Sequence, residues 1–299
     1  MMNIFESCNR NIDLNDVIVV VIALPDEERN RVLTWADYRF KSHLYLPWLW
    51  DAIVESEQLK KVARELLGSD TVVIWSTDWC VKPCMSEGHF SWHQDSTYSQ
   101  FGEDALTLWI AFSDLDSDLC GPVAFKVGSH KLGQMPHVEK RSVSNSANNN
   151  MLALGQTIPE QFDSDIIDKL HLSSKQELTV EQKTWTSKFE TVTACPLECG
   201  MASAHSFLTI HSSQSNRHPT RDRIGLALRL VNAEYNKPGK RPDRVTLLCG
   251  KERDVQRFGD FEKRPNKEFG EEEMKEWQLS IMKENEFYFQ SSSVKQYTQ

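Results

Sequence analysis

The sequence has no excess of basic residues and no long apolar run. Its 299 residues carry a formal net charge of −9, whereas a general phosphate-binding surface requires the opposite sign. No stretch of the sequence approaches the roughly 18 apolar residues of a membrane span. Residues 1–24 lack the basic flank and the small-residue cleavage site of a signal peptide. We therefore expect neither nucleic acid nor a membrane as a partner, although a local basic pocket for an acidic small molecule is allowed.

The cysteines do not suggest a secreted, disulfide-linked protein. There are seven of them, an odd number. Cys80 and Cys84 form one C-x3-C pair, and Cys195 and Cys199 form another. A four-cysteine zinc site is one interpretation, but three-residue spacing is not the commonest form of such a site. We favour seven reduced thiols, which predict a cytoplasmic protein.

The chain also lacks internal repeats and any linker rich in proline or glycine, so we expect one domain over residues 1–299. Hydrophobic residues make up 39% and charged residues 26% of the sequence, as in globular proteins with a large core. Apolar residues at helical spacing predict helices over 25–43 and 56–67, within a helical N-terminal part over 1–70. The charged tail over 263–290 predicts a helix on the outside.

Short strands are predicted from residue 71 to about residue 235. The near-continuous apolar run over 105–112 is typical of a buried strand. Residues 131–188 interrupt the strands with a long excursion, which includes an Asn-rich segment over 142–150. Long loops inside compact domains are uncommon unless they are functional or disordered, so a lid over an active site and a plain insertion are equal alternatives. The expected fold is mainly β with flanking α.

One short stretch, residues 92–96 (WHQDS), combines two metal-ligand side chains. On an extended strand, positions i and i+2 point to the same face, so the His93 imidazole and the Asp95 carboxylate aim at one point. A second histidine would complete a facial triad, which leaves coordination positions open and suits a non-haem Fe(II) that activates O2. An isolated H-x-D pair is common by chance, so the rest of the chain has to support this interpretation.

His211 and Arg223 support it from the end of the strand set. In a double-stranded β-helix the first and last strands are neighbours, so His211 can converge with His93 and Asp95. A guanidinium in an apolar barrel needs an anion, and a carboxylate accepts its two parallel hydrogen bonds. A diacid cosubstrate fits, with one end on the iron and the far carboxylate on Arg223.

Several ordered blocks between about residues 75 and 235 resemble the phytanoyl-CoA dioxygenase (PhyH-like) family of Fe(II)- and 2-oxoglutarate-dependent oxygenases. The blocks are His93-Gln94-Asp95, residues 105–111, Gly121-Pro122, Gly128-Ser129-His130-Lys131, Asn150-Met151-Leu152, Gly155-Gln156, residues 211–216 and residues 223–227. The resemblance implies a double-stranded β-helix (jelly roll, cupin-like) with N-terminal and C-terminal helices. It also implies Fe(II), 2-oxoglutarate and O2 as cofactor and cosubstrates.

Carried over residue by residue, the resemblance makes His93, Asp95 and His211 the iron ligands. Arg223 would pair with the distal carboxylate of 2-oxoglutarate. The loop after His211 is one residue longer than is usual in the family, so Arg221 is a rival for this role. Arg223 is preferred because the Ile-Gly-Leu-Ala run of the family follows it directly.

The resemblance implies further contacts with 2-oxoglutarate. Thr107 stands where the family has a small hydroxyl residue that shares the contact with the distal carboxylate. Trp109 and Ser213 match positions that line the cosubstrate pocket, and Lys82 matches one on a weaker alignment. The chain departs from the family at residues 198–201 (ECGM), where a Pro-Gly-Asp or Pro-Gly-Glu turn is common.

Other polar residues near the motif have less specific roles. We expect His205 to pack or to form hydrogen bonds rather than to bind the metal. His89 precedes His93 by four strand positions, or roughly 13 Å, which is too far for one metal. Gln94 and Tyr98 are candidates for contacts with the ligands or with a substrate.

The implied reaction is hydrogen abstraction from an unactivated C–H bond of a small organic substrate, with succinate and CO2 as co-products. We expect an amino acid or a specialised metabolite as the substrate. Because Asp95 fills the position that related halogenases leave to chloride, hydroxylation is expected, and oxidative cyclisation or desaturation would use the same ligands. The alternatives are an acyl-CoA 2-hydroxylase of the phytanoyl-CoA type and a cupin-like metal enzyme or binding protein that does not use 2-oxoglutarate.

Overall fold

The structure is a computed structural model, and most residues from 37 onwards are described. The described residues are 2–3, 37–99, 101–138, 149–152, 155–163, 178–234, 243–255, 257–285 and 294–295. Most of the helix expected over 25–43 lies outside them, and its described end forms two 3-10 helices, η1 (Asp37–Arg39) and η2 (Ser42–Leu44). Residues 142–148 of the Asn-rich segment also lie outside.

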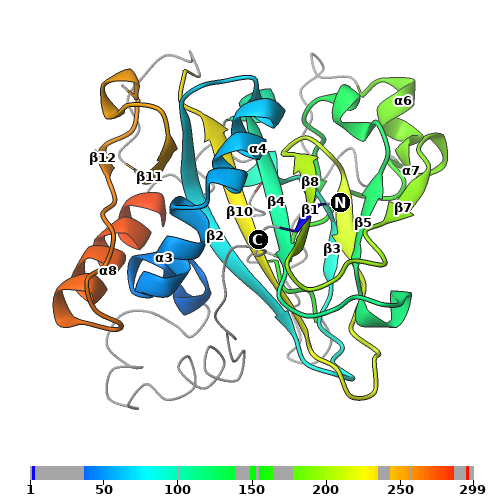
Figure 1. Ribbon diagram of the computed structural model, residues 1–299. Helices are drawn as coiled ribbons and strands as arrows, with labels where there is room; N and C mark the ends of the chain where they lie inside the picture. The colour runs from blue at the N-terminus through cyan, green and yellow to red at the C-terminus, as the bar shows by residue number, and fades with distance from the viewer. Residues whose placement is uncertain are drawn as a thin grey trace.

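The larger of two facing sheets has seven strands (Figure 1). In spatial order they are β1 (Met2–Asn3), β8 (Met201–Ser206), β4 (Ala105–Ala111), β10 (Arg223–Asn232), β2 (Val72–Lys82), β11 (Arg244–Cys249) and β12 (Asp260–Phe261). Neighbouring strands run antiparallel except β11 and β12. The central strands β4, β10 and β2 are buried along nearly their whole length, as the apolar run over 105–112 predicts.

The smaller sheet has four strands, all antiparallel. In spatial order they are β3 (Phe90–His93), β9 (His211–Ser213), β5 (Val123–Lys126) and β7 (Thr191–Thr193). Strand β9 comes from late in the chain yet lies between β3 and β5, so early and late strands alternate in space. This order confirms the expected double-stranded β-helix. A separate parallel pair joins β6 (His137–Val138) to β13 (Val294–Lys295).

Helices cover the outer face of the larger sheet. They are α3 (Pro47–Val54), α4 (Glu57–Leu67) and α8 (Glu271–Asn285). The Ser56 side chain accepts the Leu59 N–H at 3.2 Å, and Gly68 ends α4 with φ +60°, as a capping residue and a left-handed glycine do. The helices expected over 56–67 and within 263–290 are thus confirmed. Within the described ranges, every helix is too short or too polar to cross a membrane.

The described part of the excursion over 131–188 packs against the smaller sheet. It includes two short helices, α6 (Val180–Lys183) and α7 (Trp185–Lys188). Met135, Ile158 and Trp185 are buried together with Ile210, which directly precedes β9. Leu152, from the same excursion, lines the cavity between the two sheets. The lid remains a prediction.

Strand β10 shows how the sheet separates an apolar face from a polar one. Leu226, Leu228 and Leu230 point toward the helices and belong to the main apolar core. Arg223 and Arg229 line the cavity between the sheets. Because residues two apart share a face of a strand, the alternation in this strand directs its charged side chains into the cavity.

A buried charge cluster joins the N-terminal segment to the C-terminal elements. Lys41 is fully buried, and its Nζ lies 2.6 Å from Glu262 and 3.4 Å from Glu284 of α8. Thr246 of β11 donates to Glu262 at 2.7 Å, and His43 Nε2 lies 3.0 Å from the same hydroxyl. Burial alone would raise the pKa of Glu262, but Lys41 and His43 lower it to about 2. The cluster therefore fixes α8 and β11 to the N-terminal segment through paired charges.

Replacing Lys41 with methionine should strongly destabilise the fold. Lys41→Met leaves two buried carboxylates without their cation, and loss of one partner of a buried ion pair costs about 3–5 kcal/mol. Lys275→Met is the matched control, because its Nζ lies 2.8 Å from Glu271 on the surface of α8, where ion pairs contribute little. Urea unfolding would measure both variants. Equal midpoints for Lys41→Met and the wild type would contradict the prediction.

Candidate metal centre

Two strands and a turn bring three potential ligands together. β3 ends at His93, β9 begins at His211, and these two residues are opposite each other in the pairing. Asp95 does not continue the strand as expected, because it begins a 3-10 helix, η3 (Asp95–Tyr98). The turn still directs its carboxylate to the same point, so the side-chain convergence does not depend on a continuous strand. All three side chains are buried.

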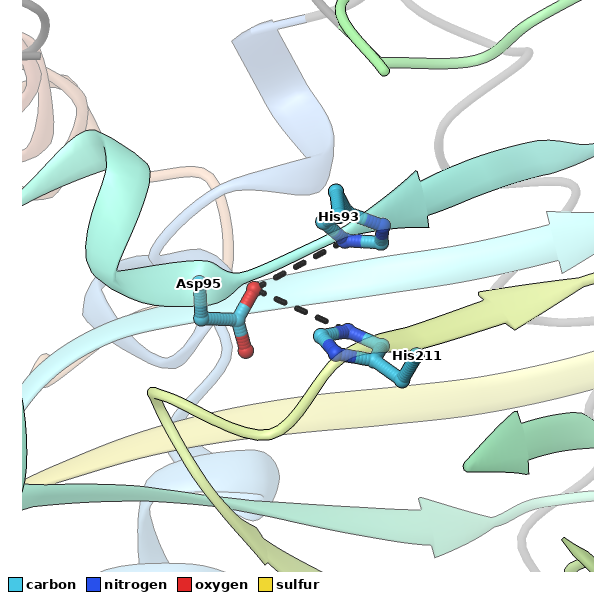
Figure 2. Close-up of side chains that lie close together, drawn as sticks. All are labelled: His93, Asp95 and His211. Atoms are coloured by element: carbon cyan, nitrogen blue, oxygen red, sulfur yellow. Dashed lines mark ion pairs between the residues drawn. The ribbon is translucent and has the colours of Figure 1, made fainter. Parts of the chain in front are cut away.

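The distances between these side chains suit one metal ion. Asp95 Oδ1 lies 3.9 Å from Nε2 of His93 and 3.9 Å from Nε2 of His211 (Figure 2). All three ligand atoms lie within 4.8 Å of one another. A transition-metal ion lies about 2.1 Å from nitrogen or oxygen ligands, so it can reach two atoms that are 3.9 Å apart. The three side chains can therefore bind one ion with little movement.

Backbone carbonyls fix the tautomer of both histidines. His93 Nδ1 lies 2.7 Å from Ser91 O, and His211 Nδ1 lies 3.0 Å from Thr209 O. A carbonyl only accepts, so each Nδ1 carries the proton and each Nε2 presents a lone pair, as metal-bound histidines require. Burial lowers the pKa of both imidazoles, which keeps them neutral. Burial alone would raise the pKa of Asp95, but His205, His211 and the Arg229 guanidinium hold it well below its usual range.

The second oxygen of Asp95 faces away from the two ligand histidines. Thr107 Oγ1 donates to Oδ2 at 2.5 Å, and His205 Nε2 lies 3.5 Å from the same atom. His205 packs its ring against Phe125, with 5.1 Å between centroids, and neither of its nitrogens has a hydrogen-bond partner within the described chain. The His205 ring thus packs as predicted. Thr107 lies against Asp95, and its predicted contact with 2-oxoglutarate stays a prediction.

Two buried basic side chains lie close together: Arg223 lines the cavity of the triad, whereas Lys82 lines a separate pocket. Lys82 and Arg223 are opposite each other on β2 and β10, and both are buried. Lys82 donates to Ser213 O at 3.0 Å and to the Gln214 carbonyl, and Arg223 Nη1 donates to Ser213 Oγ at 2.7 Å. Arg223 Nε has no hydrogen-bond partner among the described residues, and no described carboxylate pairs with either cation. Burial and Arg223 lower the pKa of Lys82 to about 6.

This arrangement is costly unless an anion fills the pocket. The buried Arg223 guanidinium loses its hydration, and its hydrogen bonds to Ser213 Oγ and the Gly121 carbonyl supply no counter-charge. A carboxylate would restore the balance, because guanidinium binds it with two parallel hydrogen bonds. The Arg223 guanidinium, with its unpartnered Nε, therefore fits an acidic ligand.

Trp109 and Gly225 determine where the guanidinium lies. Arg223 Cζ lies 4.8 Å from the centroid of the Trp109 ring, a distance at which a cation is attracted to an aromatic face. A Cβ on Gly225 would fall 1.9 Å from Trp109 Cζ2. Only glycine lets the ring lie against the strand, so Gly225 is a site residue that sequence reasoning missed. The Ile-Gly-Leu-Ala run after Arg223 includes this glycine and could have identified it.

Arg221 lies in different surroundings from Arg223. Its Nη1 lies 2.6 Å from Asp116 Oδ2 at the surface. Asp116 belongs to a second group of ligand-type side chains, with Cys120 and His218. This group does not suit a cation, because Arg221 already neutralises the carboxylate. His218 Nδ1 also accepts two backbone N–H groups, from Thr220 and Arg221, at 3.3 and 3.0 Å, which leaves the proton on Nε2.

The four-cysteine zinc site does not form. In the part of the chain that the structure describes, the two groups named above are the ones whose ligand atoms converge. Cys80, Cys84, Cys195 and Cys199 are free, as are the other described cysteines. The zinc-site interpretation is therefore wrong, and the described cysteines are free thiols.

Three further charged side chains line the cavity. Arg39 Nε lies 3.3 Å from Asp78 Oδ1, and Arg229 Nη2 lies 3.7 Å from Asp78 Oδ2. All three line the cavity with the triad. Arg229 shares the inward face of β10 with Arg223, so strand alternation offered a signal for it.

The Gln94 side chain points to neighbouring loops. Its Nε2 donates to the carbonyls of Gly133 and Leu208 at 2.8 and 2.7 Å. These bonds hold the backbone between His93 and Asp95.

Comparisons with known proteins agree with this architecture. A family model described as Phytanoyl-CoA dioxygenase (PhyH) matches residues 26–224. The chain is similar to the apo structure of ThoJ, a non-heme monooxygenase, with a TM-score of 0.66, 21% identity, and coverage of 91% of this chain and 86% of ThoJ. The ThoJ–Ni complex gives a TM-score of 0.60 and 20% identity, with coverage of 91% and 87%. No curated protein sequence matches the chain.

The triad predicts one tight site for a divalent transition metal. We expect Co(II), titrated by calorimetry, to bind the wild type with one ion per chain, and His211→Ala to lose this binding because one of three ligands is gone. His218→Ala is the matched control from the second group and should bind Co(II) as the wild type does. Loss of binding in His218→Ala with retention in His211→Ala would contradict the assignment.

Proposed function

The chain belongs to the phytanoyl-CoA dioxygenase family, and on this basis we propose that His93, Asp95 and His211 hold the catalytic Fe(II). The family uses Fe(II), 2-oxoglutarate and O2, so the chain is an Fe(II)- and 2-oxoglutarate-dependent dioxygenase. Its proposed reaction is the oxidation of an unactivated C–H bond in a small organic substrate. The observation that carries the proposal is the convergence of both Nε2 atoms on Asp95 Oδ1, at 3.9 Å each.

We propose that 2-oxoglutarate binds between the triad and the buried pair of Arg223 and Lys82. Its distal carboxylate would pair with Arg223 and Lys82, and Ser213 Oγ, which lies 2.7 Å from Arg223 Nη1, would stand beside it. The Trp109 ring, with its centroid 4.8 Å from Arg223 Cζ, packs against the guanidinium. Arg223 is preferred to Arg221, because the latter is half exposed and paired with Asp116.

When bound, iron and 2-oxoglutarate supply the oxidation: substrate R–H, 2-oxoglutarate and O2 give R–OH, succinate and CO2. The protein positions these partners. The carbonyls of Ser91 and Thr209 keep Nδ1 of each ligand histidine protonated, so neither imidazole has to exchange a proton during the reaction.

Hydroxylation is the proposed outcome, since Asp95 occupies the third ligand position. Oxidative cyclisation and desaturation use the same ligands and would depend on the substrate. Arg39, Asp78 and Arg229 line the same cavity and favour a polar substrate, in keeping with an amino acid or a specialised metabolite. We also propose that the chain forms a single domain and works in the cytoplasm, where free thiols such as those described stay reduced.

The proposal predicts a spectroscopic signature that needs no substrate. Anaerobic titration of the apo-protein with Fe(II) and 2-oxoglutarate should produce a weak visible charge-transfer band, because the cosubstrate chelates the metal. His211→Ala should show no band at the same concentrations. A folded wild-type protein without the band would overturn the assignment.

The same band measures the affinity for 2-oxoglutarate. Truncation of a buried cation that pairs with a ligand carboxylate costs about 2 kcal/mol or more, which is roughly 30-fold in affinity. We therefore expect Arg223→Ala to raise the half-saturating concentration of 2-oxoglutarate by at least ~30-fold. Arg221→Ala, the matched control, should leave it unchanged. The reverse pattern would identify Arg221 as the anchor.

A further inference from the structure

The two oxygens of Asp95 have different surroundings. Oδ1 faces Nε2 of His93 and of His211 at 3.9 Å each. Oδ2 accepts the Thr107 hydroxyl at 2.5 Å, within the short range of hydrogen bonds to carboxylates. Among the described side chains, this hydroxyl makes the shortest contact with the carboxylate, and it comes from the opposite sheet.

A fixed contact of this kind is needed to orient the carboxylate. The terminal torsion of aspartate is soft, so the plane of the carboxylate rotates at little cost. Asp95 also lies in a short 3-10 turn rather than in a paired strand. Without a partner for Oδ2, rotation would turn Oδ1 away from the two histidines, and the buried Oδ2 would lack a donor.

Thr107 is well placed to act as a rigid support. It lies in the middle of β4, paired with His205 on one side and with Arg229 on the other, and its side chain is buried. The branched Cβ of threonine restricts χ1. The direction of the hydroxyl is thus fixed by a central strand.

We propose that Thr107 is a positioning residue of the metal centre, which holds Asp95 Oδ2 so that Oδ1 faces the metal. This inference rests on the proposed metal ligation. It differs from the role that the family resemblance implies, a contact with the distal carboxylate of 2-oxoglutarate. The cross-strand partner of Thr107 is Arg229, six strand positions or about 20 Å from Arg223 along β10.

His205 does not replace this support. Its Nε2 lies 3.5 Å from Oδ2, which is beyond the usual range of an N–H···O hydrogen bond. Its ring is also held by packing against Phe125 and His211, with centroids 5.1 and 4.4 Å away. A shift of His205 toward Oδ2 would disturb His211 itself.

Anaerobic calorimetric titration with Fe(II) alone tests the proposal. We expect Thr107→Val, which keeps the shape but removes the hydroxyl, to weaken Fe(II) binding by about 10- to 100-fold, the usual effect of losing a group that orients a metal ligand. Thr107→Ser keeps the hydroxyl and should stay within about 3-fold of the wild type, because its donor is retained. Thr107→Ala serves in place of Thr107→Val if the valine variant does not fold.

The matched control is Thr246→Val. Thr246 is a buried threonine that donates to a carboxylate, Glu262, at 2.7 Å, far from the triad on β11. Its loss should lower the thermal midpoint but leave the Fe(II) affinity unchanged. A general destabilising effect would instead weaken binding in both variants.

Each remaining outcome has a distinct meaning. Wild-type affinity for Fe(II) in Thr107→Val overturns the inference and leaves the proposed function intact. If that variant binds Fe(II) normally but requires more 2-oxoglutarate for its charge-transfer band, Thr107 has the role that the resemblance implies. Absence of Fe(II) binding by the wild type itself overturns the proposed function, and the inference with it.

Discussion

The antiparallel pairing of β3 with β9 is the contact on which the site depends. It sets His93 directly opposite His211, although the two residues are far apart in the chain. A shift of one residue in register would turn one imidazole to the opposite face. The backbone hydrogen bonds between β3 and β9 therefore determine whether Nε2 of His93 and Nε2 of His211 lie close together. Met135, Ile158 and Trp185 support this sheet with an apolar cluster around Ile210.

Charge in the cavity is unevenly paired. Arg39 and Arg229 lie against Asp78, whereas Arg223 has no carboxylate partner in the described chain. Folding buries the Arg223 guanidinium at an electrostatic cost, since buried charge is unfavourable without a counter-ion. The proposed cosubstrate carries two carboxylates, one for the metal and one for Arg223. Its binding would thus recover stability that the empty pocket lacks.

Sequence reasoning predicted the main features of the fold and of the site because they depend on local rules. Ser56 and Gly68 delimit α4 through capping and a left-handed turn. The alternation of β10 predicts that Arg223 faces inward, and the H-x-D spacing predicts that His93 and Asp95 share a target. The predicted strand through Asp95 was wrong, because the chain turns after His93 and Asp95 begins a 3-10 helix. The alternation of side chains along a strand does not describe such a turn.

The types of ligand, their order along the chain and the face that each strand presents follow from the sequence, since side-chain direction in a strand depends on position parity. Which groups meet depends on how the strands and sheets pack. This packing buried Arg223 and paired Arg221 with Asp116, and it set Thr107 against Asp95. It also put the Trp109 ring against Gly225. These outcomes depend on register and on the distance between facing sheets, and both follow from packing of the whole chain rather than from any local pattern.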